Sequence, residues 1–460
     1  MFTLIKNEIY KIFHKKSTYI VLIICMAFIL LITGLSKYLQ THDNSFIYGA
    51  SFYDEDNMDE VSRQTYKDYQ DKLAKYNPDT WQYNYITTND YYSIAYNYYS
   101  SLSESSEEQN FYKEIYDKTN KALAEDNWQY LVKEEITDVK AQIASIKNQE
   151  AITKQDEANL FSLNAQLDCL EYRLNESVSY NNDYLNEALQ IVINNASSTY
   201  KYEHTTNKEE KEYTKQEAKS YYESKYVLDT KEDINNDLNL RSLIIEFFTN
   251  YFFLILVFVI MISGAIVSDE YNKGTIKSLL ITPYKRSTIL LAKYITTLIM
   301  VLFIIAFMLV FQIVVGGIIL GFGSLKVSYV VYNLTTKSLE IINLFKYFLL
   351  VLGATLPQII LLATLAFALS TILANTAFAI AITFCGVIGS SIINMLASAY
   401  KLKFLNYFVT TNWDFNLYLF GNNNIYGNSV THAIIVCLVY YLIMIITTFI
   451  VFKRKNIKNI

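Results

Sequence analysis

Proline and cysteine are scarce in this sequence, with three prolines and four cysteines in 460 residues. Residues 37–243 form a long polar stretch that contains few glycines and a single proline, Pro78. Because proline and glycine are the strongest helix breakers, their scarcity predicts a mainly helical segment. Only one cysteine, Cys169, lies in this stretch, so a disulfide scaffold within it is excluded.

Motifs for common enzymatic chemistry are also missing. No Gly-x-x-x-x-Gly-Lys-Ser/Thr phosphate loop and no Gly-x-Ser-x-Gly nucleophile turn occur. The four histidines are isolated from one another and from any cysteine pair, so no metal-site spacing emerges. We therefore expect no catalytic residue, no metal ligand and no nucleotide site in this chain. It is not expected to be an enzyme or to bind nucleic acid.

What the sequence does contain is long apolar segments. Hydrophobic residues make up 52% of it, and six runs without Lys, Arg, Asp or Glu have about the length that a membrane-spanning helix needs. The runs are Thr18–Leu35, Phe247–Val267, Tyr294–Leu320, Tyr347–Leu369, Thr376–Leu396 and Ala433–Phe452. Ionisable residues inside spans usually mark ion or proton pathways, so their absence disfavours an ion-driven transporter.

Charge is distributed unevenly. Residues 37–243 carry 21 basic and 38 acidic residues, a net charge of −17, whereas the rest carries 18 and 6, a net charge of +12. Thirteen basic residues lie before the first run, between runs two and three, and after run six: Lys6, Lys11, Lys15, Lys16, Lys273, Lys277, Lys285, Arg286, Lys293, Lys453, Arg454, Lys455 and Lys458. The opposite loops carry only Lys326, Lys337, Lys346, Lys401 and Lys403. The positive-inside rule then predicts two cytoplasmic termini and an extracellular domain at 37–243.

The source is predicted from composition. Lys outnumbers Arg 34 to 5 and there are 40 Tyr, which indicates AT-rich codons. An exported domain without disulfides fits the same origin. We expect a multi-pass protein in the plasma membrane of a low-GC Gram-positive bacterium.

Two heptad seams lie in the middle of the polar stretch. Their apolar positions are Val132, Ile136, Val139, Ile143 and Ile146, and then Leu160, Leu163, Leu167, Leu170 and Leu174. Between them, Thr153 is a candidate helix N-cap, with Asp156 three residues later. The pattern predicts an antiparallel coiled-coil hairpin with its tip near residues 148–154. Two separate amphipathic helices on one small domain are the alternative.

The charged segment between runs two and three has a more specific pattern. It reads Glu270, Gly274-Thr275, Leu279-Leu280, Pro283, Arg286, Ile289-Leu290 and Lys293 in order. This order resembles the cytoplasmic segment of type-2 (ABC-2 type) ABC transporter permeases, with Lys285 where that family often has Ser. The start of the chain is also similar to the family's amphipathic elbow helix. Here Phe2, Ile5, Ile9 and Ile12 supply an apolar face, and Lys6, Lys11, Lys15 and Lys16 can meet anionic lipid.

The resemblance implies an exporter permease driven by a separate ATPase. Two permeases, identical or homologous, would associate with two cytoplasmic ABC ATPase subunits, which bind the ATP and Mg. Residues 268–287 would form the coupling segment, a short amphipathic helix on the membrane surface that Pro283 ends, and its coupling residues would include Gly274, Thr275, Pro283 and Arg286. Glu270 is the residue expected to make a charged contact with the ATPase, followed by Lys273 and Lys277. Charge-free spans suit an apolar or amphipathic substrate: an antimicrobial peptide, a lipid or a drug.

The expected architecture is therefore an all-α polytopic membrane protein. It has an elbow helix at 1–17, a first span at 18–36, a helical extracellular domain at 37–243, and five further spans within 244–460. Gly316, Gly317 and Gly321 are expected to allow close packing between spans. Residues 403–421 resemble the permease family's outer re-entrant turn. The alternative function is a surface docking or secretion-associated membrane protein that uses its outer domain as a stalk and has no ATPase.

Overall fold

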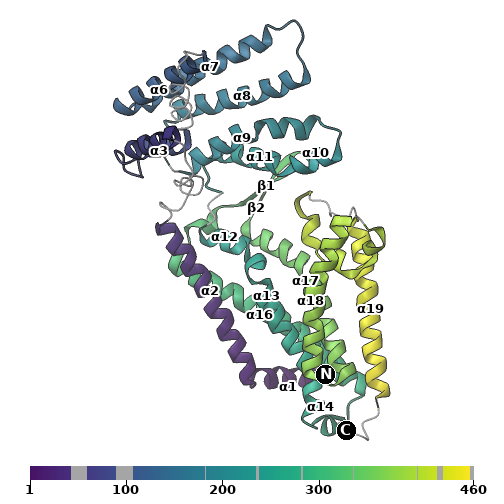
Figure 1. Cartoon of the computed structure of the whole chain (residues 1–460). Helices are drawn as coiled ribbons and strands as arrows, with labels where there is room; N and C mark the ends of the chain where they lie inside the picture. Colours follow the sequence, from purple (N-terminus) through teal and green to yellow (C-terminus); the bar gives the residue numbers. More distant parts are fainter. Residues whose placement is uncertain are drawn as a thin grey trace.

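The computed structural model describes residues 1–42, 60–89, 107–181, 183–234, 238–280, 283–334, 336–400, 402–421 and 428–455. Within these ranges, six helices are long and apolar enough to cross a membrane. They are α2 (Lys16–His42), α13 (Phe247–Ala265), α16 (Arg286–Leu320), α17 (Leu344–Leu373), α18 (Thr376–Tyr400) and α19 (Val430–Arg454). The chain is thus a helical polytopic membrane protein, and this part of the prediction is confirmed. Figure 1 shows these helices in the lower half of the molecule and the inserted helices above them.

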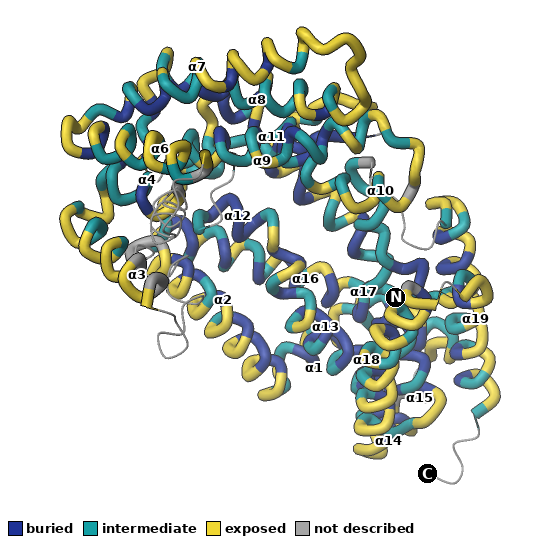
Figure 2. The backbone as a smooth tube through the Cα atoms, turned by 45° about the horizontal axis from the view of Figure 1, so that its top comes forward, coloured by how far each residue is buried: buried dark blue, intermediate teal, exposed yellow. Residues whose placement is uncertain are grey.

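Apolar side chains lie both between the membrane helices and on the outer surface of the bundle that these helices form. The inner cluster centres on α13 and includes Phe247, Tyr251 and Ile255, each with no exposed surface. Large apolar side chains on α2, α18 and α19 are exposed, as the yellow stretches of these helices in Figure 2 show. Exposed apolar surface on this scale is not tolerated in water but is required in lipid.

A polar bridge links three spans near the insert. The Tyr251 hydroxyl donates to Gln312 Oε1, and Gln312 Nε2 donates to Thr33 Oγ1 at 3.2 Å. The bridge joins α13, α16 and α2, and Gln312 is fully buried. A buried amide is tolerated only when its donors and acceptors are satisfied, so the bridge fixes how these helices face one another.

The three glycines near the end of α16 do not act alike. A Cβ added at Gly316 would lie 2.6 Å from Leu240 in α12 (Leu240–Ile245), so this glycine allows a close approach between helices, though not between two spans. At Gly317 the close neighbour is the ring of Phe322, five residues along the same chain. Gly321 has a φ of +88° and no atom within 4 Å of an added Cβ. Among the described residues, the predicted close packing between spans is therefore wrong at all three glycines, although Gly316 does allow the approach of α12, and Gly321 ends the helix.

The insert between α2 and α12 is a stack of helices. Its described elements are α3 (Glu60–Leu73), α4 (Trp81–Asn89), α6 (Glu107–Ala124), α7 (Trp128–Lys147), α8 (Lys154–Asn175), α9 (Tyr184–His204), α10 (Lys208–Tyr213) and α11 (Lys215–Thr230). The predicted hairpin is confirmed as α7 and α8, which form the top layer in Figure 1. All positions of the two seams except Ile146 lie in one apolar cluster, and Thr153 and Asp156 form the expected capping box. α9 and α11 lie below, closer to the membrane helices.

A small β-hairpin was not predicted. β1 (Tyr329–Asn333) pairs antiparallel with β2 (Ser338–Ile342) between α16 and α17. β1 also contacts the insert: the Tyr332 backbone N–H donates to Glu223 Oε1 at 2.9 Å, and the Tyr332 ring stacks on Tyr222 at 4.1 Å. The insert is therefore fastened to the connection between two spans and not only to its own ends.

The segment before the last span consists of short turns. Residues 403–421 contain three 3₁₀ pieces, η3 (Lys403–Tyr407), η4 (Val409–Thr411) and η5 (Phe415–Gly421), which lie between α18 and α19. Asn412 holds the turns together by donating from Nδ2 to the carbonyl oxygens of Asn406 and Phe408, at 2.7 and 2.8 Å. The segment is too irregular to span a membrane, in keeping with the interruptions in its sequence.

The two ends of the membrane helices differ. The end near the insert carries α12, η2 (Gly323–Lys326), the β-hairpin and η3 to η5, and we refer to it as the insert end. The opposite end carries α1 (Phe2–Phe13), α14 (Ser268–Asn272) and α15 (Ile276–Leu280), together with the end of α19, and we refer to it as the basal end.

Candidate functional site at the basal end

Acidic residues are rare outside the insert, and three of the six gather at the basal end. Residues 1–36 and 244–460 contain only Glu8, Glu246, Asp269, Glu270, Glu340 and Asp414. Glu8 lies on α1, and Asp269 and Glu270 lie on α14 directly after span α13. Such a concentration in an otherwise basic region points to a specific structural or functional task.

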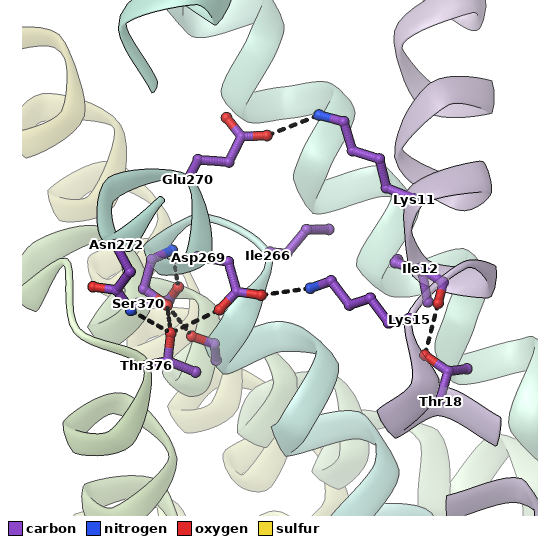
Figure 3. Close-up of polar contacts among 12 residues, drawn as sticks. Lys11, Ile12, Lys15, Thr18, Ile266, Asp269, Glu270, Asn272, Ser370 and Thr376 are labelled. Atoms are coloured by element: carbon purple, nitrogen blue, oxygen red, sulfur yellow. Dashed lines mark hydrogen bonds and ion pairs between the residues drawn. The ribbon is translucent and has the colours of Figure 1, made fainter. Parts of the chain in front are cut away.

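The carboxylates on α14 reach toward α1. Asp269 Oδ2 pairs with Lys15 Nζ at 2.6 Å, and Glu270 Oε1 pairs with Lys11 Nζ at 2.9 Å. Figure 3 shows the two pairs side by side across the gap between the helices. Two parallel ion pairs resist sliding and rotation better than one, so α1 and α14 are held in a defined register.

Lys293 forms the buried centre of the cluster. It lies in the second turn of α16 and is only 1% exposed. Its ammonium donates to Glu8 Oε2 at 2.7 Å, to Glu270 Oε1 at 2.8 Å and to the Ile266 carbonyl oxygen at 3.1 Å. An ammonium has three N–H donors, and all three are used. We call Glu8, Lys11, Glu270 and Lys293 the ion cluster; it joins α1, α14 and α16.

The ionisation of the cluster follows from these contacts. Burial alone would raise the pKa of Glu270, but the adjacent Lys293 and Lys11 outweigh it, so the pKa lies below its ordinary value. For Lys11, burial would lower the pKa, but the hydrogen bonds to Glu270 and Glu8 raise it overall. Glu270 and Lys11 are thus both charged at neutral pH, as a compensated buried cluster requires.

This arrangement predicts an acid-labile contribution to stability. Because the folded pKa of Glu270 is depressed, its contribution is present above its ordinary pKa of 4.5 and is lost as the pH falls through the lower folded value. Thermal unfolding in detergent should therefore show wild type more stable than Glu270→Gln at pH 7. The difference should shrink below pH 4.5. A difference that stays constant down to pH 3 would contradict this assignment.

Hydroxyl groups hold α14 on its other side. The Ser268 backbone N–H donates to Ser370 Oγ in α17 at 3.0 Å. Thr376 Oγ1 at the start of α18 donates to Asp269 Oδ1 at 2.9 Å and accepts from Asn272 Nδ2 at 3.1 Å (Figure 3). α14 is thus fixed to α1, α16, α17 and α18 at once.

The other residues predicted to act in the coupling segment are exposed. Lys273, Gly274, Thr275 and Lys277 lie at the surface, as does Pro283. Arg286 is exposed and donates to the carbonyl oxygens of Lys453 and Lys455 at 3.3 and 3.2 Å, which ties the start of α16 to the end of α19. The predicted residues therefore divide into a buried group on α14 and an exposed group from Lys273 onward.

Three expectations are corrected here. The segment is not one helix: Gly274 has a φ of +69°, a conformation that suits glycine, and it separates α14 from α15. Glu270 is not a surface residue, since it is 7% exposed and faces Lys11 and Lys293. Lys11 and Lys15 are engaged by α14 carboxylates and not left free for lipid.

Sequence reasoning missed Glu8 and misplaced Lys293. Glu8 falls on the otherwise apolar face of α1, between Ile5 and Ile12. An acidic residue on an apolar face was the one sequence feature that could have indicated a buried, paired carboxylate. Lys293 is predicted only as one of the basic residues between runs two and three, whereas the structure buries it in α16, which begins seven residues earlier. Among the residues that the structure describes, no group of His, Cys, Asp and Glu could hold a metal ion.

Comparison with known proteins places most of this architecture in a family. Residues 209–458 match the family described as "Protein of unknown function (DUF2705)". The chain belongs to this family. The match takes in Asp269, Glu270 and Lys293 but not Glu8, Lys11 or Lys15. The ion cluster therefore connects the family region to a helix outside the matched residues.

Two curated proteins of Bacillus subtilis (strain 168) are similar to the chain. "Uncharacterized protein YhcI" is 28% identical over 213 residues, which cover 46% of this chain and 67% of that protein. "Uncharacterized membrane protein YdbK" is 23% identical over 200 residues, which cover 43% of this chain and 76% of that protein. No solved structure matches the chain.

Proposed function

We propose that the chain is the permease subunit of an ATP-driven type-2 ABC exporter in a bacterial plasma membrane. In this proposal the basal end faces the cytoplasm. A separate ATPase binds the exposed surface from Lys273 to Lys277, which we call the coupling surface, and two permeases assemble with two ATPase subunits. The substrate is apolar or amphipathic.

The observation that carries the proposal is the attachment of α14. It contacts four membrane-associated helices, α1 and α16 through the ion pairs to Lys11, Lys15 and Lys293, and α17 and α18 through hydroxyl groups. A force applied to the coupling surface would pass to several spans together, which is what an externally powered permease needs. The ion cluster would connect α14 rigidly to α1 and α16, and Glu270 would act as a positioning residue that holds α14 in place beneath the coupling surface.

Charge placement supports the orientation. Twelve of the thirteen basic residues assigned to one side lie in described parts of the basal end, on α1, the start of α2, α14 to α16 and the end of α19. Lys458, the thirteenth, lies outside the described residues. Basic residues of this density next to spans are typical of the cytoplasmic side.

The proposal is tested by reversing charge on the coupling surface. The full chain is purified from its native membranes in mild detergent, and co-eluting ATP hydrolysis is measured. Lys273→Glu with Lys277→Glu should remove at least about nine-tenths of the co-eluting activity, because loss of an interfacial charge contact costs more than about 1.4 kcal/mol. The matched control, Lys326→Glu with Lys346→Glu, reverses two exposed lysines at the insert end and should retain it.

The folded state is monitored by the elution profile, since all four lysines are exposed. If the wild-type chain carries no co-eluting ATPase activity, or if both double variants retain it equally, the permease proposal fails. A function lost only on removal of the α7–α8 hairpin would then favour the stalk alternative.

A further inference from the structure

A second site lies at the insert end, far from the ion cluster. A cavity of about 550 Å³ opens between the first turns of α13, the first half of α17, β1 and η5. Drug-sized ligands occupy cavities of roughly 300–1,000 Å³, so the volume is suitable. Its walls combine aromatic rings with a few polar groups, and none of the described residues that line it is Lys or Arg.

One wall consists of three aromatic rings in mutual contact. The Tyr329 and Tyr347 ring centroids are 3.9 Å apart, and Phe420 lies 5.4 Å from the first and 5.8 Å from the second. Phe248 and Phe252 on α13 line another part of the cavity. The faces of such rings carry negative electrostatic potential and attract cations.

The backbone at Phe420 is strained. Its φ is +55°, in the left-handed region that side chains with a Cβ rarely adopt. Strained residues of this kind persist only where the surrounding structure holds them, and they cluster at ligand clamps. Here the strain places the Phe420 ring against Tyr347, nearly parallel to it at 13°.

The polar wall offers acceptors that lack donors. Asp414 Oδ1 accepts from the Asn416 backbone N–H and from Asn416 Nδ2, both at 3.1 Å. Within the described part of the chain, Asp414 has no ion-pair partner, and no donor reaches its Oδ2. Asn416 Nδ2 also donates to Thr355 Oγ1 at 3.0 Å, while Asn416 Oδ1 is buried without a partner. A buried acceptor without a donor costs free energy, which a ligand with N–H groups or positive charge would recover.

Charge also decides against an anion. Arg241, buried near Tyr329 and Tyr347, donates to the carbonyl oxygens of Ile234 and Ser328 at 2.8 and 3.0 Å. Nη1 and Nη2 of Arg241 are therefore engaged by backbone carbonyl oxygens, and Arg241 is not among the described residues that line the cavity. The carboxylate on the cavity wall belongs to Asp414, one of only six acidic residues outside the insert.

We propose that this cavity binds an organic cation with an apolar body, such as a protonated or quaternary amine. The Asp414 carboxylate balances its charge, and the Tyr329, Tyr347 and Phe420 rings contact its apolar groups. The proposal does not depend on the proposed export function, because binding is a property of the chain alone.

The test uses two probes of the same shape and opposite charge. Tetraphenylphosphonium and tetraphenylborate are titrated into the purified full chain in detergent, and binding is followed by calorimetry with empty micelles subtracted. We expect saturable binding of the phosphonium and no saturable binding of the borate. Asp414→Asn should weaken phosphonium binding at least about tenfold. Phe420→Ala should weaken it about threefold to thirtyfold, the range expected for a lost cation–π contact.

The matched control is Glu209→Gln on α10, which removes an exposed carboxylate away from the cavity and should leave binding unchanged. Equal binding of both probes would mean that the cavity selects for shape alone and would overturn the proposal. Absence of saturable phosphonium binding to the wild-type chain, or binding unaffected by Asp414→Asn, would overturn it as well.

Discussion

Replacing Lys293 by methionine is expected to destabilise the chain by about 3–5 kcal/mol, the range for breaking a buried ion pair by removing one partner. The substitution keeps most of the side-chain volume but leaves Glu8 and Glu270 as buried carboxylates with only the half-exposed Lys11 between them. Thermal unfolding of the variant and of wild type in detergent is measured by fluorescence-detected size-exclusion chromatography, and their stabilities are compared.

Two further variants make this expectation specific. Lys277→Met removes an exposed lysine nearby and should change stability by less than about 1 kcal/mol. Adding Glu8→Gln to Lys293→Met leaves one acid and one base, Glu270 and Lys11, and should recover part of the loss. A double variant no more stable than Lys293→Met, or equal effects at positions 277 and 293, would show that charge compensation is not what the cluster provides.

The second large effect is expected in the insert. Val132 has no exposed surface and packs in the apolar cluster between α7 and α8. Val132→Asp would place a carboxylate there without a cation, at a cost of more than about 3 kcal/mol. Because this cluster is separate from that of the membrane helices, the hairpin should unfold while the membrane part stays folded.

Limited proteolysis of the full chain checks this outcome. In Val132→Asp the hairpin should be cleaved readily, and a protected membrane-embedded fragment should remain. Gln129→Asp, an exposed position in the first turn of the same helix, adds the same charge and should be cleaved as slowly as wild type. Equal resistance of both variants would refute the packing of the hairpin, whereas loss of the protected fragment would refute the independence of the two cores.

The sequence predicted those elements whose signal is local and repeated. Six uninterrupted apolar runs sufficed for the spans, and heptad spacing with the Thr153–Asp156 capping box sufficed for the hairpin. The β-hairpin at 329–342 was missed because its strands have five residues each and lack the two-residue Asn-Gly type of turn that identifies short hairpins.

The ion cluster could not be predicted from the sequence, for a different reason. Glu8, Glu270 and Lys293 are separated by 262 and 23 residues, and nothing in the sequence states that α1 folds back against α14. Charge outside an apolar run was therefore assigned to the surface, which is its usual place. At Lys273 and Lys277 that assignment agrees with the observed exposure, and at Glu270 it does not.

The length of α16 has a mechanical consequence. From Lys293 to Leu320 the helix runs without interruption for about 40 Å, at 1.5 Å per residue. A rod of this length that tilts by about 10° around the ion cluster moves its other end by about 7 Å. That end leads into β1, whose Tyr332 is hydrogen-bonded to Glu223 of the insert. A tilt of α16 too small to detect at the basal end would therefore be amplified along the helix, and it would be measurable as a change in distance between two labels placed on the insert and on α19.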